Sequence, residues 1–147
     1  MNLISFNICG LGNSLKITAL KILLERVNSG AILLQETMTS LVQACELFLK
    51  ICPSRLCCGM DVVGMSRGLL VAWNSKVDDF KPFSTTIGII IERKFIGMER
   101  RIRILNVYGP YIERKVLWEH VTKAVILIDS SLIIVGDFNF TLPSDEV

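Results

Sequence analysis

The chain has 147 residues, of which 51% are hydrophobic and 20% charged, and this apolar content excludes an intrinsically disordered or collagen-like chain. Sixteen basic and fourteen acidic residues leave a net charge of +2, so an anionic partner would be bound locally rather than attracted by an overall field. The length predicts about one domain. The apolar content is nevertheless high for so short a chain, because small domains expose proportionally more surface.

No apolar run approaches the ~20 residues that a membrane-spanning helix needs. The N-terminal segment has neither the basic start nor the unbroken apolar stretch of a signal peptide, so we expect an intracellular protein without a membrane partner. The cysteines number five and include no Cys-x-x-Cys pair, and His120 is the one histidine. This set argues against a disulfide framework and against structural zinc, which needs four closely spaced ligands.

Hydrophobic periodicity predicts the order β-α-β-α-β-β-β-α-β. The predicted strands are residues 3–6, 31–35, 68–73, 87–91, 101–108 and 132–135, and the predicted helices are residues 15–27, 41–52 and 113–128. Ser14 is the candidate N-cap of the first helix, and Thr39 or Ser40 that of the second. Residues 57–67 give no clear signal and are expected to be a loop. Because the middle strands must pair as hairpins, the pattern predicts a mixed α/β (α+β) domain rather than a purely parallel sheet.

Conspicuous polar side chains follow the C-terminal ends of the predicted strands. They are Asn7, Glu36, Tyr108, Asp137 and Asn139. If these strand ends converge, they gather two carboxylates, two amides and a phenol in one cleft. Hard oxygen ligands without a thiolate or histidine cluster suit Mg²⁺ or Mn²⁺ rather than zinc. Such a site is the usual requirement of phosphoryl-transfer hydrolysis.

Each of these residues also has an ordinary structural explanation. Asn7 can cap the loop before the first helix, and Glu36 can be a solvated surface charge. Asp137 and Asn139 can belong to a turn, where both residue types are common. Taken singly, the structural explanation is the stronger one. Because these residues are all placed at strand ends, a functional site is supported as well as the structural explanation.

A dinucleotide-binding loop is a rival interpretation of the first strand and helix. Gly10-x-Gly12 follows a strand and precedes a helix, and Glu36 ends the next strand. Leu15 stands at the third glycine position, where it would crowd the contact between helix and strand. The predicted hairpins also do not belong to that fold, so this interpretation is the weaker one.

Four segments resemble the successive motifs of the endonuclease/exonuclease/phosphatase superfamily. They are residues 4–7 (ISFN), 34–37 (LQET), 106–110 (NVYGP) and 136–139 (GDFN). Residues 66–74 (SRGLLVAWN), together with the Tyr-Gly-Pro segment, further resemble the endonuclease domain of LINE-type (non-LTR) retrotransposon proteins. The similarity extends over essentially the whole chain, with the motifs in the family's order.

The resemblance implies a DNase I-like fold of two packed mixed sheets flanked by helices. It also implies Mg²⁺-dependent cleavage of phosphodiesters, with nicking of DNA in a nucleus. Asn7 and Glu36 match the metal-site positions, Glu36 as the direct ligand. Tyr108 matches the tyrosine near the scissile phosphate. Asp137 matches the carboxylate that orients or deprotonates the attacking water, and Asn139 the amide that supports it.

The sequence also departs from the family pattern. The family continues with further strands, a late Asp and an Asp-His pair, whereas this sequence ends at Val147. His120 is expected on a helix surface and does not replace the missing histidine. Arg67 stands where a small residue is usual, and Phe6 replaces the usual tryptophan.

From these departures we expect residues 1–147 to be the N-terminal portion of the domain, with an incomplete second sheet and little or no turnover. A non-catalytic retroelement remnant that binds nucleic acid weakly is the alternative. The high apolar content then predicts an uncovered sheet face, and therefore poor solubility or self-association.

Overall fold

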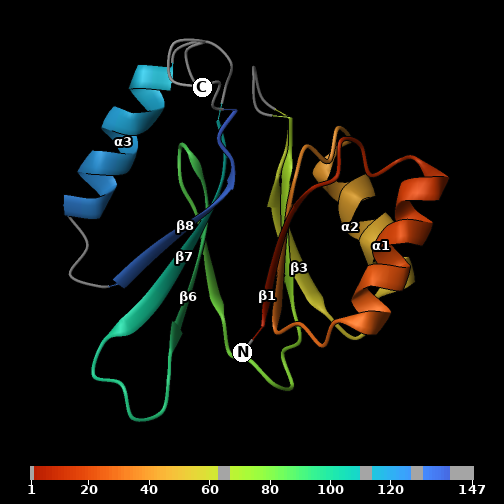
Figure 1. Ribbon diagram of the computed structural model, residues 1–147, viewed down its shortest axis with the longest axis horizontal. Coiled ribbons are helices and arrows are strands. Elements are labelled where there is room, and N and C mark those ends of the chain that lie inside the picture. Colours follow the sequence, from red (N-terminus) through yellow and green to blue (C-terminus); the bar gives the residue numbers. More distant parts are fainter. Residues whose placement is uncertain (1, 63–66, 110–113, 127–130, 140–147) are drawn as a thin grey trace, which may run out of the picture.

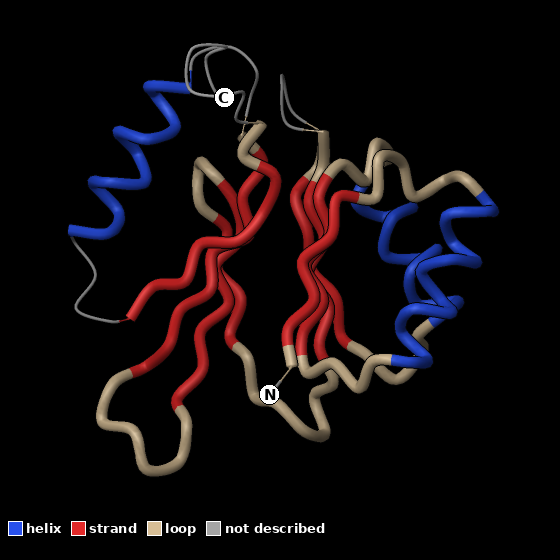
Figure 2. Tube along the Cα trace, in the orientation of Figure 1, coloured by secondary structure: helices blue, strands red, loops and turns tan. Residues whose placement is uncertain are grey.

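The computed structural model describes residues 2–62, 67–109, 114–126 and 131–139. Within these residues, two four-stranded sheets stack face to face and helices cover both outer faces (Figures 1 and 2). The prediction of a mixed α/β domain with two packed sheets and flanking helices is confirmed.

The first sheet has the strand order β1-β2-β4-β3. These strands are β1 (Leu3–Asn7), β2 (Ala31–Gln35), β4 (Leu69–Trp73) and β3 (Leu56–Met60). β1 and β2 are parallel and are connected through helix α1 (Ser14–Arg26), whereas β4 is antiparallel to both of its neighbours. Every residue of β2 and β4 is buried, because both faces of these strands are covered. Their unbroken apolar sequences are typical of such strands.

The second sheet has the strand order β5-β6-β7-β8. These strands are β5 (Lys81–Ser84), β6 (Gly88–Lys94), β7 (Arg101–Tyr108) and β8 (Ser131–Asp137). The first three are antiparallel, and β7 and β8 form a parallel pair on either side of helix α3 (Arg114–Ile126) in the sequence. Each sheet therefore contains one parallel pair.

Apolar side chains form three buried layers. The central layer lies between the sheets and includes Leu33, Trp73, Ile91 and Ile104. Helix α1 and helix α2 (Leu41–Ile51) pack on the outer face of the first sheet, and α3 packs on that of the second (Figure 1). The inner faces of the two sheets cover each other, and this arrangement accounts for much of the high apolar content. The prediction of an uncovered sheet face is therefore wrong for the described residues, because side chains of the second sheet pack against the inner face of the first.

Two strands were not predicted from the sequence. Residues 57–67 were expected to be a loop, but β3 occupies Leu56–Met60, an edge strand with the weakly patterned sequence LCCGM. β5 (KPFS) is also an edge strand, and all of its residues are exposed. Pro82 is tolerated there because the outer side of an edge strand needs no ladder hydrogen bond.

The helix caps agree with the prediction at one helix and differ at another. The N-cap of α1 is Asn13 rather than Ser14, since Asn13 Oδ1 accepts hydrogen bonds from the backbone N–H groups of Leu15 and Lys16. Ser40 caps α2, and its hydroxyl accepts from the N–H of Gln43. None of the helices in the described residues is long and apolar enough to cross a membrane. All five cysteines are free thiols.

Candidate phosphodiesterase site

The carboxyl ends of the two parallel strand pairs meet at one edge of the sandwich. Asn7 ends β1 and Asp137 ends β8, and Asn7 Nδ2 donates a 2.6 Å hydrogen bond to Asp137 Oδ2. Tyr108 is paired in register with Asp137, and Glu36 follows directly after β2. The structure therefore brings the strand ends of both sheets together, which is the condition that the sequence analysis set for a shared cleft.

Glycine allows β8 to approach β7 closely just before Asp137. Gly136 has φ 143°, and a Cβ there would lie 1.8 Å from the carbonyl oxygen of Val107. The N–H of Gly109 donates a 2.6 Å hydrogen bond to the carbonyl of Asp137. A Cβ on Gly109 would lie 2.6 Å from the carbonyl oxygen of Phe138. Larger residues at either position would move Asp137 away from Asn7.

Asp137 accepts hydrogen bonds from two directions. Its Oδ2 accepts from Asn7 Nδ2, and its Oδ1 accepts from the backbone N–H of Asn139 at 2.9 Å. The amide of Asn139 donates to the carbonyl of Gly109. Both oxygens of Asp137 are thus fixed in orientation, and Asn139 is held beside them.

Glu36 is a buried carboxylate, with 4% of the residue exposed. Its carbonyl accepts a 2.7 Å hydrogen bond from the N–H of Gly10, which ties the loop after β2 to the loop after β1. Arg67 Nη1 lies 3.6 Å from Glu36 Oε1. Because burying an isolated carboxylate is costly, this position requires a cation, and Arg67 supplies one in the present arrangement.

Cys9 lies close enough to the carboxylates of Glu36 and Asp137 for both to affect its thiol. Its backbone N–H and its Sγ both donate to Asn7 Oδ1, at 2.9 and 3.1 Å. Desolvation raises the pKa of the Cys9 thiol, and the carboxylates of Glu36 and Asp137 raise it further, while Lys16 opposes them. The thiol is therefore protonated at neutral pH and serves as a weak hydrogen-bond donor.

Tyr108 presents a buried hydroxyl to the same cluster. Among the described residues no atom meets hydrogen-bond geometry with this hydroxyl, although Glu36 and Asn139 are near enough to affect its pKa. Burial raises the pKa of Tyr108, Glu36 raises it further, and Asn139 acts in the opposite direction. The hydroxyl is therefore neutral at physiological pH and able to donate.

Left-handed backbone conformations concentrate at the site. In the described residues the non-glycine positions with positive φ are Cys9 (48°), Glu36 (56°), Met38 (53°) and Asn139 (49°). Such conformations are unfavourable for most side chains and persist only where the surrounding structure holds them, commonly at functional sites. The strain supports a functional rather than a purely structural explanation of this edge.

Comparison with known proteins identifies the family. The model of the endonuclease/exonuclease/phosphatase family matches residues 4–147. The chain belongs to this family. The solved structures show the same DNase I-like fold. None of the curated proteins matches the sequence of this chain significantly.

Three solved structures illustrate the similarity. D. rerio TDP2 complexed with a single-strand DNA product superposes with a TM-score of 0.71 at 17% identity, over 95% of this chain and 61% of that one. The X. laevis APE2 catalytic domain superposes with a TM-score of 0.65 at 17% identity, over 97% of this chain and 60% of that one. The Neisseria 3' phosphatase NExo bound to a product DNA hairpin superposes with a TM-score of 0.67 at 15% identity, over 98% of this chain and 60% of that one. The chain thus spans less than two thirds of the length of each.

The donor set of the site fits a hard divalent cation. Two carboxylates, of Glu36 and Asp137, and the amide of Asn7 offer oxygen atoms, and Mg²⁺ is usually held by one or two carboxylates with several waters. Within the described ranges, no group of three or more His, Cys, Asp and Glu side chains is arranged so that it could hold a metal ion.

Several features of the site were not found from the sequence. The thiol of Cys9, the pairing of Arg67 with Glu36, and the contact of Lys16 with the Cys9 carbonyl were not anticipated. The departure of Arg67 from the family pattern was the one available signal. His120, as expected, is exposed on α3.

Proposed function

We propose that the chain carries the site of a divalent-metal-dependent phosphodiesterase that nicks DNA, with Mg²⁺ or Mn²⁺ as its cofactor. The observation that supports this most directly is the hydrogen bond from Asn7 to Asp137, which joins the two sheets beside the buried carboxylate of Glu36. Two of the similar structures are named as complexes with DNA products, which supports nucleic acid as the substrate class.

Asn7 and Glu36 would hold the metal, with Glu36 as the direct ligand. A divalent cation bound there would neutralise the negative charge that develops on the phosphate oxygens. The burial of Glu36 limits competition from water, so its charge acts in a region of low dielectric constant.

The remaining three residues would act on water and phosphate. Asp137, fixed by Asn7 and by the N–H of Asn139, orients or deprotonates the attacking water, and Asn139 supports it. The neutral hydroxyl of Tyr108 donates a hydrogen bond to a phosphate oxygen, since no described residue engages it. Such preorganised donors stabilise a transition state without reorganising during the reaction.

We further propose an origin in a LINE-type retrotransposon and hence a nuclear location. The segment SRGLLVAWN at residues 66–74 and the segment NVYGP at residues 106–110 support this subfamily. As the N-terminal portion of such a domain, residues 1–147 would then be adjoined by further parts of the nuclease.

We expect slow or no turnover by this chain alone. The described residues place no histidine at the site, and loss of one transition-state contact commonly costs about 10²–10³ in rate. The pairing of Arg67 with Glu36 favours a second candidate function, that of a non-catalytic nucleic-acid-binding module in which the arginine replaces the metal.

A metal-binding titration combined with a nicking assay tests the proposal. Electron paramagnetic resonance measures free Mn²⁺ against the chain, against Glu36→Gln, and against Glu46→Gln as a matched exposed control. Nicking of supercoiled plasmid in Mg²⁺ is followed with the same proteins. We expect Glu36→Gln alone to weaken Mn²⁺ binding and to abolish any slow nicking.

The other outcomes are equally informative. Unchanged Mn²⁺ binding by Glu36→Gln would contradict the metal site. Salt-dependent DNA binding that neither requires metal nor leads to nicking would favour the binding module. Fast nicking that depends on Glu36 would support the activity but contradict the expectation of slow turnover.

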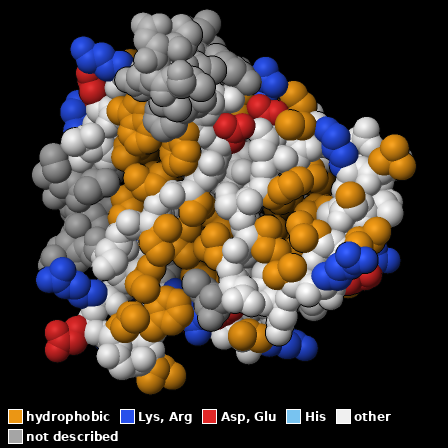
Figure 3. Space-filling view, viewed as in Figure 1, with side chains coloured by type: hydrophobic (Ala, Val, Ile, Leu, Met, Phe, Trp, Pro, Cys, Tyr) orange, Lys and Arg blue, Asp and Glu red, His pale blue; other side chains and the backbone are white. Residues whose placement is uncertain are grey.

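We also propose that the chain self-associates. Hydrophobic side chains form patches on the face shown in Figure 3. Three edge strands carry large exposed apolar residues, namely Leu56 on β3, Phe83 on β5 and Ile133 on β8. Unpaired edges with apolar residues are templates for pairing with another chain. Light scattering after gel filtration checks this, and a monodisperse monomer would count against it.

A further inference from the structure

An apolar cavity of about 330 Å³ lies between β1 and α1 and adjoins the candidate site. Phe6, Ala19 and Leu23 contribute to its apolar wall. Asn7 and Cys9, which belong to the candidate site, also line it, so the cavity adjoins the site at the end of β1. Its volume is at the lower end of the range for ligand pockets, which run from about 300 to 1,000 Å³.

A single cation stands where the cavity meets the site. Lys16 lines the cavity, and its Nζ donates to the carbonyl of Cys9. In the described part of the chain no carboxylate lies within ion-pair distance of Lys16. The first turn of α1 likewise contains no acidic residue, although acids are favoured at that position. The positive charge of Lys16 is therefore available to an anion.

The wall of the cavity suits a flat aromatic group. Phe6 is 44% exposed and lines the cavity, so part of its surface is accessible to a ligand there. An apolar cavity with a lysine at its edge fits a ligand that is flat and apolar at one end and anionic at the other. A nucleotide has this construction, because its base has a π-face and its phosphate is charged.

We propose that this cavity takes one unpaired base of the nucleic-acid strand whose phosphate is cleaved, with the base stacked on Phe6 and an adjacent phosphate on Lys16. This inference rests on the proposed function and narrows its substrate class to single-stranded or locally unpaired nucleic acid. A base inside a duplex cannot enter such a cavity without leaving its stack.

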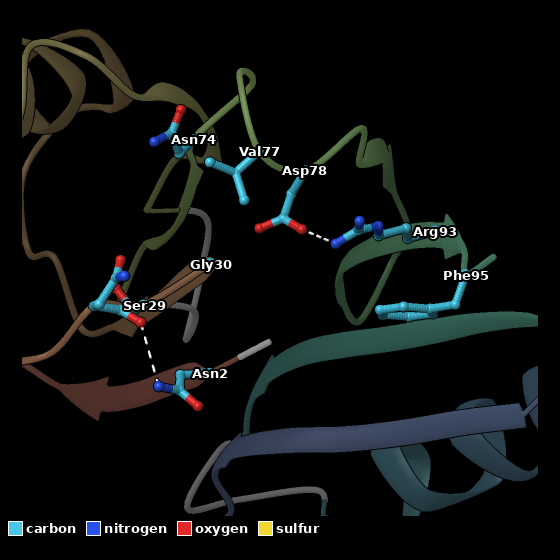
Figure 4. A pocket seen from close by; sticks show the side chains of 9 residues that line it. Asn2, Ser29, Gly30, Asn74, Val77, Asp78, Arg93 and Phe95 are labelled. Carbon is cyan, nitrogen blue, oxygen red and sulfur yellow. Dashed lines mark hydrogen bonds and ion pairs between the residues drawn. The ribbon is translucent and has the colours of Figure 1, made fainter.

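A second cavity of about 460 Å³ does not meet these requirements (Figure 4). It includes Asn2, and so lies at the opposite end of β1, roughly 15 Å from Asn7 at the usual rise per residue of a strand. Its two charged lining residues, Asp78 and Arg93, form an ion pair with each other. It therefore offers no unpaired cation to a phosphate.

The test compares oligonucleotides that differ by a single base. The intact chain is titrated, in Ca²⁺ to suppress cleavage, with a fluorescently labelled single-stranded DNA decamer. A series of decamers replaces each nucleotide in turn with an abasic tetrahydrofuran residue. We expect one position at which the missing base weakens binding by at least about fivefold, since a base stacked on an aromatic ring contributes substantially to the affinity.

Variants then assign that preference to the cavity. Ala19→Phe fills the cavity and should abolish the preference, whereas Thr18→Phe, on the neighbouring exposed face of α1, should retain it. Phe6→Leu should reduce the preference and Phe6→Trp should restore it. Lys16→Gln should weaken binding of every decamer and lower its salt dependence without altering the preference. Circular dichroism melts check that each variant is folded.

The outcomes separate this inference from the proposed function. Binding of all decamers without any preferred position would overturn the base-binding cavity while leaving the phosphodiesterase proposal intact. A preference that persists in Ala19→Phe would also overturn it, because the base would then lie elsewhere. Absence of binding to every decamer would overturn the base-binding cavity, whereas the phosphodiesterase proposal is decided separately by Mn²⁺ binding and by nicking of the plasmid.

Discussion

Gln35 Nε2 donates a 2.6 Å hydrogen bond to Asn106 Oδ1 across the interface between the two sheets. Both residues are buried, and Asn106 Nδ2 in turn donates to the carbonyl of Leu34 at 3.2 Å. Gln35 immediately precedes Glu36, and Asn106 lies two residues before Tyr108. This polar bridge within an otherwise apolar layer therefore fixes the relative position of the two sheets directly beneath the candidate site.

Removal of one side of this bridge should destabilise the protein. Asn106→Leu leaves the amide of Gln35 with one partner fewer, so the free energy of unfolding should fall by about 1–3 kcal/mol. The double variant Gln35→Met/Asn106→Leu should lose less than the sum of the two single changes, because no buried polar group remains unpaired. Urea denaturation measures each value, with exposed Asn28→Leu as control. Strictly additive losses would contradict the bridge.

The environment of Glu92 leads us to expect that the protein loses stability in acid. It is buried on β6 and accepts hydrogen bonds from Arg101 and Arg103 at 2.5 and 2.6 Å. Burial raises its pKa, but the two arginines outweigh that effect, so the pKa of Glu92 lies below its usual value of 4.5. Its contribution is therefore complete above about pH 4.5 and disappears as the pH falls through the lowered pKa.

Glu92→Gln should remove that contribution. At pH 7 the free energy of unfolding should fall by roughly 1–3 kcal/mol, since charge-assisted hydrogen bonds are lost. Once the pH has fallen below the lowered pKa of Glu92, the variant and the parent should become similarly stable. Thermal unfolding between pH 3 and pH 7 checks this, with exposed Glu46→Gln as control. A constant difference at all pH values would show that Glu92 does not titrate in this range.

The parts of the fold that could be predicted are those in which local sequence and tertiary environment agree. β2 has the unbroken apolar sequence AILLQ and is buried on both faces, so its pattern is unambiguous. β5 has the sequence KPFS, and its strand conformation comes from pairing with β6 rather than from its own residues. No local signal for such an edge strand exists in the sequence.

The candidate site, like the fold, could be predicted only in part from the sequence. The position of Asn7, Glu36, Tyr108 and Asp137 at predicted strand ends indicated that these side chains could share one cleft if the strand ends converged. The meeting of Asn7 with Asp137, which are 130 residues apart, depends on how two separate sheets stack. The family resemblance supplied that relationship, but side-chain contacts between loops, such as that of Arg67 with Glu36, could not be inferred from either source.

Tyr108→Phe should separate function from stability. Because no described atom hydrogen bonds to the Tyr108 hydroxyl, its removal should leave the free energy of unfolding unchanged or raise it by up to about 1 kcal/mol. Any slow nicking that the parent shows should nevertheless fall by about tenfold or more in the variant, since a donor to the phosphate is lost. Since the pKa of Tyr108 is raised above 10, the effect should be the same from pH 6 to pH 9. Equal nicking by variant and parent would contradict the proposed role.

Arg67→Ser should strengthen divalent-metal binding. Arg67 Nη1 lies 3.6 Å from Glu36 Oε1, so the guanidinium competes with a metal ion for the negative charge of Glu36. The arginine side chain is 44% exposed, and an exposed ion pair is worth about 0.2–1 kcal/mol, so the affinity for Mn²⁺ should rise by up to about fivefold. Electron paramagnetic resonance titration measures the affinity, and added salt should reduce the difference.

Arg26→Ser is the matched control for this change. It removes the same charge from an exposed position in the last turn of α1, so the net charge of the two variants is identical. If both variants gain affinity equally, the effect comes from net charge rather than from the contact with Glu36. If Arg67→Ser instead loses affinity, the arginine positions Glu36 for the metal, and the competition inferred from the 3.6 Å contact is wrong.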